Sequence, residues 1–347
     1  MNPLYDQMQT SIFERMSSLA ARHEAINLGQ GFPDFGWPEE ILEAAARALK
    51  QGSNQYAPSR GLPALREAIA DHYNRHHGLQ LIADHVCVTS GATEALASAI
   101  LATLQPGDEA IVFTPAYDAY APLIRGAGAT VRVVALRPPE WRLDADALAA
   151  AIGPSTRAIV FNNPHNPAGR LFDDAELEIV AAAARGHGLI VISDEVWEHI
   201  LLNGQGFRPL ASLPGMAERV IKCGSAGKIF SLTGWKIGWL VATPELATVA
   251  ARARDRMAKG LRAAGYAVLD GASTYFQCVD LKASGIDTDD ETFARLAVEQ
   301  AGVAVVPLSA FAEQDPPRHM IRLCFAKQDR TIDAGVAALA KARDLAR

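Results

Sequence analysis

The chain has 347 residues, of which 49% are apolar and 21% are charged, a balance typical of a globular protein large enough for two domains. Its formal net charge of -6, with no dense run of Lys and Arg, argues against nucleic acid as a partner. No stretch of the sequence has the length of a membrane-spanning helix, so we expect no membrane partner and a cytoplasmic location. The four cysteines are widely spaced in apolar runs, which favours buried thiols over disulfides or zinc ligands, and we expect no metal site.

Short apolar runs alternate with alanine-rich helical patterns over most of the chain. The runs cover residues 85–89, 109–113, 131–135, 158–161, 189–193, 220–223 and 238–242. Most are rich in Val and Ile and apolar throughout, which indicates parallel strands buried on both faces. We therefore predict an α/β fold with a mostly parallel, seven-stranded sheet sandwiched by helices, in a large domain of residues 41–250.

The C-terminal part has a different pattern. Residues 275–279, 303–306 and 320–325 are predicted strands, and two helical patterns accompany them. The first opens at Thr288, with Glu291 three residues later as a capping box, and the second has Ile332 and Leu339 on one face. We predict a smaller α+β domain made of residues 1–40 and 251–347.

Small and polar residues follow four of the predicted parallel strands, at the sheet edge where α/β proteins bind ligands. In chain order they are Gly91, Ala92 and Thr93, then Asn166, then Asp194, then Ser225 and Lys228. Taken singly, each has an ordinary explanation as a helix cap, a turn or a solvated charge. Together they offer an anion cradle, an amide, a carboxylate, a hydroxyl and an amine. Pyridoxal phosphate, with its phosphate, ring nitrogen and aldehyde, would use all of them.

Motifs spread from near residue 12 to near residue 330 form a specific set. They lie at 26–35, 55–58, 60–61, 65–66, 90–96, 163–169, 193–196, 225–228, 233–238 and 321–325. The set resembles the fold-type I, class I/II pyridoxal-phosphate aminotransferases, in the branch with kynurenine, glutamine–phenylpyruvate and methionine aminotransferases. The resemblance implies the fold of that family, a homodimer with shared sites, and transfer of an amino group.

The resemblance also implies roles for single residues. Lys228 would first act as a nucleophile and hold the cofactor as a Schiff base. It would then act as the general base that moves a proton. Asp194 would keep the ring nitrogen protonated, and Asn166 would bind the ring hydroxyl. Arg322 would grip the substrate carboxylate in a bidentate fork, and Gly31 would let the N-terminal segment close over the substrate.

The remaining expected contacts surround the cofactor. The phosphate would be bound by Ser225, Lys236, the backbone of Gly91, Ala92 and Thr93, and Tyr56 of a neighbouring subunit. Tyr117 would stack on the ring, although an ordinary cleft aromatic explains it almost as well.

The sequence departs from the family at two places. Trp197 stands where the family usually has tyrosine, and an indole can donate a hydrogen bond but cannot become an anion. A family stretch of some tens of residues, which helps line the partner's site, is missing where Arg254 runs directly into Asp255. We expect Trp197 to alter ring electronics, unless it only fills space.

These features predict an aminotransferase that exchanges an amino group between an L-amino acid and a 2-oxo acid. One charged clamp, Arg322, is evident, and the aromatic residues near it favour apolar, sulfur-containing or aromatic donors. Two alternatives remain: a cysteine-conjugate β-lyase, and a cofactor-binding protein whose catalysis is impaired by the missing stretch.

Overall fold

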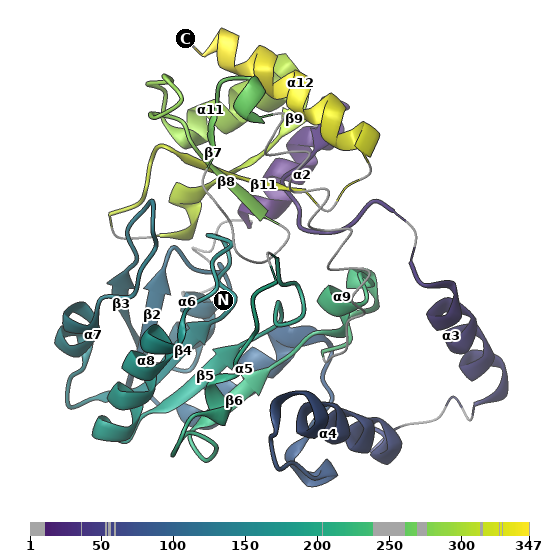
Figure 1. Cartoon of the computed structure of the whole chain (residues 1–347), viewed down its shortest axis with the longest axis vertical. Helices are drawn as coiled ribbons and strands as arrows, with labels where there is room; N and C mark the ends of the chain where they lie inside the picture. The colour runs from purple at the N-terminus through teal and green to yellow at the C-terminus, as the bar shows by residue number, and fades with distance from the viewer. Residues whose placement is uncertain are drawn as a thin grey trace.

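The computed structural model describes residues 11–35, 37–52, 54, 57–58, 60–202, 204–238, 261–268, 276–312, 315–325, 327 and 329–346. Within them the chain forms a large parallel sheet with its helices and, above it in Figure 1, a smaller unit of strands and helices. No helix of the described residues is long and apolar enough to span a membrane.

The large sheet has five parallel strands in the order β3-β2-β4-β5-β6. They are β2 (Glu109–Thr114), β3 (Thr130–Ala135), β4 (Thr156–Asn162), β5 (Ile190–Asp194) and β6 (Val220–Cys223). Alternate residues face opposite sides, so Ile111 packs under α8 and Val112 packs under α5. The covering helices are α7 (Ala145–Ala151) and α8 (Asp174–His187) on one face, and α5 (Gly91–Thr103) and α6 (Tyr120–Gly126) on the other. This arrangement confirms the predicted α/β fold.

The predicted strand at residues 85–89 is wrong, and of the predicted strand at residues 238–242 only Gly238 is among the described residues, in which the sheet has five strands. Residues Ala83–His85 form a short 3-10 helix, η1, and only Thr89 makes a β-bridge, antiparallel to Gly238. The guanidinium of Arg66 donates to the carbonyls of Ala83 and Val86, each at 3.0 Å from Nε. Backbone groups that a strand would need are therefore used by a side chain.

The smaller unit combines the C-terminal part with the N-terminal segment. Its antiparallel sheet runs β10 (Val306–Pro307), β11 (Met320–Cys324), β8 (Phe276–Asp280) and β7 (Ala267–Val268). Helices α2 (Ile12–Arg22), α11 (Asp290–Leu296), η4 (Ala297–Ala301) and α12 (Asp329–Leu345) surround it. Strand β1 (Ile26–Asn27) pairs in parallel with β9 (Val303–Ala304). This pairing supports the proposal that residues 1–40 and 251–347 form one small domain.

Two local predictions for this unit need correction. The run 303–306 splits into β9 and β10, and α11 is capped one residue later than expected. Asp289, not Thr288, is the cap, because its carboxylate accepts the N–H of Thr292 at 2.9 Å.

The remaining elements are short or lie at the edge of the molecule. They are α3 (Glu39–Gln51), α4 (Pro63–His77), α9 (Ala226–Ile229), η2 (Leu210–Ser212), η3 (Thr233–Trp235) and η5 (Leu308–Phe311). Helix α3 stands apart from the rest of the chain in Figure 1, and none of its 13 residues is buried. Of the four cysteines, three are buried thiols as predicted, whereas Cys87 is exposed.

Candidate active site

A cavity of about 640 Å³ lies beyond the carboxyl ends of β4, β5 and β6. It collects nearly every residue that the sequence places at the site: Gly31, Gly91, Ala92, Thr93, Tyr117, Asn166, Asp194, Trp197, Ser225, Lys228, Lys236 and Arg322. Tyr56 lies outside the described residues. The segments that follow β4, β5 and β6 therefore meet, as the sheet rule predicts.

Lys228 lies on α9, the single helical turn that follows β6, and its ammonium is half-buried. Burial lowers the pKa of Lys228 to about 8, and nearby Arg322 adds to this effect. The Nζ atom lies 4.9 Å from the centre of the Trp197 ring. With this pKa roughly a tenth of the side chain would be neutral amine at pH 7, the form that both a nucleophile and a general base need.

Asp194 ends β5 and is buried. Its Oδ2 accepts the Tyr120 O–H at 2.5 Å, and its Oδ1 accepts the Val196 N–H at 3.3 Å. Burial raises the pKa of Asp194, and the hydrogen bond from Tyr120 partly opposes that rise. The contact of Tyr120 with Asp194 was not predicted from the sequence, although Tyr120 lies only three residues after Tyr117.

The N-terminus of α5 and the start of α9 provide the polar rim. Gly91 has a left-handed φ of 76°, and neither Ser90 nor Ser225 uses its side chain to cap the helix it precedes. A helix N-terminus attracts anions, and free hydroxyls add donors. One N–H is already used, because Ser90 donates to the Glu94 carboxylate.

Two further expected residues lie on this rim. Tyr117 and Thr93 are hydrogen-bonded through their side chains, and burial raises the pKa of Tyr117. Lys236 is exposed and has a left-handed φ of 56°.

Arg322, on β11, is fully buried, and burial lowers its pKa to about 10. It donates to Oδ1 of Asn166 at 2.7 Å and to the Gly29 carbonyl at 3.2 Å. The guanidinium carbon lies 3.7 Å from the centre of the Phe276 ring. Its Nε is buried without a hydrogen-bond partner, an orphaned donor that an anionic ligand could satisfy.

Aromatic side chains close the space around Arg322. Phe13 of α2, which the sequence did not indicate, lies 4.9 Å from the guanidinium carbon. Trp197 is buried and meets Phe276 edge to face at 5.4 Å. A Cβ on Gly31 would lie 2.5 Å from Phe276, so only glycine fits the close approach of the N-terminal segment.

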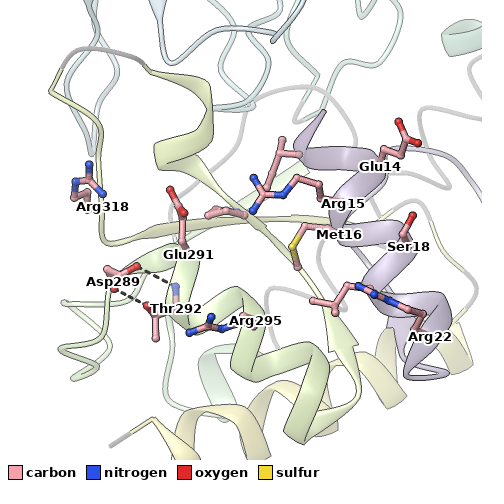
Figure 2. A pocket seen from close by; sticks show the side chains of 13 residues that line it. Glu14, Arg15, Met16, Ser18, Arg22, Asp289, Glu291, Thr292, Arg295 and Arg318 are labelled. Atoms are coloured by element: carbon pink, nitrogen blue, oxygen red, sulfur yellow. Dashed lines mark hydrogen bonds between the residues drawn. The ribbon is translucent and has the colours of Figure 1, made fainter. Parts of the chain in front are cut away.

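A second cavity of about 780 Å³ lies between α2 and α11 (Figure 2). Its polar rim carries both signs of charge: Arg15, Arg22, Arg295, Arg318, Glu14, Asp289 and Glu291. Of these, Asp289 is occupied as the cap of α11. Among the described residues no lysine lines this groove, and none of the expected site residues reaches it.

Known proteins resemble the chain over nearly its whole length. The model of the family "Aminotransferase class I and II" matches residues 23–253 and 245–339. A relative named "Probable N-succinyldiaminopimelate aminotransferase DapC" from Mycobacterium tuberculosis is 41% identical over 379 aligned positions, covering 95% of each chain. Methionine aminotransferase of Escherichia coli is 39% identical over 372 positions, covering 96% of each. A solved Escherichia coli structure identified as a methionine aminotransferase superposes with a TM-score of 0.93, at 38% identity, over 98% of this chain and 99% of the other.

These alignments also concern the expected missing stretch. The alignment of 379 positions exceeds the 347 residues of the chain, so at least 32 positions of that relative face gaps here. The family model matches in two pieces that meet at residues 245–253. A deletion close to Arg254 and Asp255 would produce both observations.

Proposed function

This chain belongs to the class I and II aminotransferase family and is an aminotransferase, and from that premise we propose that it uses pyridoxal phosphate held by Lys228. We propose further that its donors are L-amino acids with apolar, sulfur-containing or aromatic side chains, and that its acceptors are 2-oxo acids. The family depends on pyridoxal phosphate. The observation that carries the proposal is the meeting of Lys228, Asp194 and Arg322 in one cavity.

The donor set of the cavity fits the cofactor. A lysine whose pKa is about 8 suits its aldehyde, and a carboxylate at the end of β5 suits its ring nitrogen. The left-handed Gly91 and the uncapped Ser225 suit its phosphate. When bound, pyridoxal phosphate supplies an electron sink that acidifies the Cα–H bond of the amino acid.

The residues of this chain would then divide the work. Asp194 would keep a proton on the ring nitrogen, with Tyr120 holding the carboxylate in place. Lys228, once neutral, would carry the proton between the substrate carbon and the cofactor carbon. Arg322 would bind the substrate carboxylate through the free Nε and a neighbouring N–H, and Asn166 would keep its amide N–H for the ring hydroxyl.

The lining of the cavity supports an apolar or aromatic donor. Phe13, Phe32, Tyr117, Trp197 and Phe276 are its aromatic side chains. Its cations among the described residues are Lys228, Lys236 and Arg322, all of which the cofactor or the α-carboxylate would use. No described cation is left for a carboxylate on the side chain of the donor, which disfavours aspartate and N-succinyldiaminopimelate.

We also propose a homodimer. Helix α3 presents Leu42 and Leu49 on one face, and Leu49 is 70% exposed. An amphipathic helix without a buried residue needs a cover. A second copy would supply it and would bring Tyr56, the expected shared residue, towards the neighbouring site. The free cysteines support the expected cytoplasmic location.

The proposal is tested by adding single amino acids to the purified, cofactor-loaded protein and following the cofactor absorbance. We expect methionine, phenylalanine or kynurenine to convert the spectrum, and aspartate and N-succinyldiaminopimelate to act at least tenfold less efficiently. Lys228→Ala should abolish conversion, and Lys282→Ala, at an exposed lysine, is the matched control. Conversion that survives Lys228→Ala would refute the assignment.

Two further measurements separate the alternatives. Pyruvate and ammonia released from a cysteine conjugate without any 2-oxo acid would indicate the β-lyase. If the protein binds the cofactor, and is therefore yellow, but no amino acid changes the absorbance spectrum, catalytic activity has been lost with the missing stretch. Light scattering gives the oligomeric state independently of either result.

A further inference from the structure

A second cluster of titratable side chains lies outside the cavity, between α4 and the segment that follows β5. His77 ends α4, and Glu198 and His199 lie on that segment. One ligand atom from each lies within 4.8 Å of the other two, and His77 Nε2 is 4.0 Å from Glu198 Oε2. None of the three lines the cavity of Lys228.

His77 has an unsatisfied nitrogen. Its side chain is 10% exposed, and its Nε2 is buried without a hydrogen-bond partner. Buried polar atoms without a partner are rare and costly, and an ion is one of the groups that satisfies them. The orphaned atom faces the carboxylate of Glu198, which is fully buried.

The charges around this nitrogen do not balance. Lys222 bridges two buried carboxylates, Glu195 and Glu198, so that one ammonium serves two acids. Glu198 also accepts the Tyr73 O–H at 2.9 Å. With both acids ionised, the cluster carries one excess negative charge in the interior, which favours the binding of a cation.

Two of the three candidate ligands are histidines, and the neutral imidazole nitrogen is a common metal ligand in proteins. His199 Nε2 lies 3.3 Å from Nε2 of His72, a buried ring. If His199 bound the ion through Nδ1, this contact would remain and would hold the ring in place.

We propose that His77, Glu198 and His199 bind one divalent transition-metal ion, with Zn²⁺ the best fit to two imidazoles and a carboxylate. The expectation from the sequence was no metal site. Ligands at zinc distances of about 2.0–2.1 Å are closer together than these atoms, so side-chain rotation must close the site. Lys222 stays paired with Glu195, and the ion ties α4 to the end of β5.

The site is tested by calorimetric titration of Zn²⁺ into the cofactor-loaded, chelator-treated full chain. We expect one ion per chain with micromolar or tighter affinity. His77→Gln should weaken binding roughly 100-fold, because a ligand is lost. His187→Gln, at an exposed histidine in the last turn of α8, is the matched control and should leave binding unchanged.

A second probe guards against misfolding of one variant. One equivalent of Co²⁺ should give a visible absorption band that Zn²⁺ removes, and both His77→Gln and His199→Gln should lack it while retaining the cofactor spectrum. Absence of one-to-one binding in the wild-type chain would overturn the proposal, as would equal weakening by His77→Gln and His187→Gln. A shared proton would then balance the excess charge.

Discussion

Asp194 and Glu195 are neighbours in the chain, yet they enter two different polar clusters. Asp194 faces the cavity and is held by neutral donors, the Tyr120 hydroxyl and a backbone N–H. Glu195 accepts the Ser193 hydroxyl at 2.8 Å and is paired with the Lys222 ammonium. A buried carboxylate that is held by neutral groups remains available to pair with a cationic group of a ligand. A buried carboxylate that is paired with an ammonium already stabilises the fold through that ion pair.

The largest expected effect separates the two carboxylates by activity. Asp194→Asn should lower kcat/KM for amino transfer roughly 1000-fold, because a neutral amide cannot hold a proton on the ring nitrogen electrostatically. Glu195→Gln should change the rate per folded, cofactor-loaded molecule by less than about threefold, since it does not touch the substrate. Steady-state kinetics on both variants checks the pair. Equal losses of kcat/KM in the two variants would contradict the separate roles of Asp194 and Glu195.

The next effect separates them by stability. Lys222→Met should lower the free energy of unfolding by roughly 3–5 kcal/mol, because Glu195 and Glu198 lose their shared cation. Denaturant unfolding without added metal measures it, with Lys282→Met at an exposed position as control. Burial raises the pKa of both acids. A loss below about 1 kcal/mol would therefore mean that a proton already neutralises the pair.

The smallest effect concerns His165, a second buried histidine with an unpartnered nitrogen. His165 is 1% exposed, it donates to the Pro115 carbonyl, and its Nδ1 has no partner. Burial lowers the pKa of His165 to about 3. Below pH 6.5 this imidazole is therefore protonated in the unfolded chain while it stays neutral in the folded chain. Stability should therefore fall by about 1.4 kcal/mol per pH unit between pH 6.5 and that pKa.

Denaturant unfolding at pH 6.5 and pH 5 measures this contribution. His165→Gln should reduce the loss between the two values by about 2 kcal/mol. His23→Gln, at an exposed position, is the matched control. An unchanged pH dependence in His165→Gln would show that the ring accepts its proton in the folded state.

The two clusters were not equally predictable. Asp194, Asn166 and Lys228 follow apolar strands directly, so the sheet rule brings them together before any contact is known. His77 and Glu198 are 121 residues apart, and their meeting depends on how α4 packs against the segment after β5, which no local pattern encodes. Arg66 shows the same limit, because its side chain replaces a predicted strand through carbonyls that lie 17 and 20 residues away.

Helix α3 has a consequence for the order of folding. Isolated helices of about 13 residues are marginal in water, and none of the residues of this one is fully buried by its own chain. In the proposed dimer it would become ordered only when two chains meet, so its order depends on protein concentration. Dilution should expose the bonds after Arg47 and Lys50 to trypsin before the sheet opens. The last step of folding would then be the association of two chains. The same step would bring Tyr56, five residues beyond this helix, to the site of the neighbouring subunit.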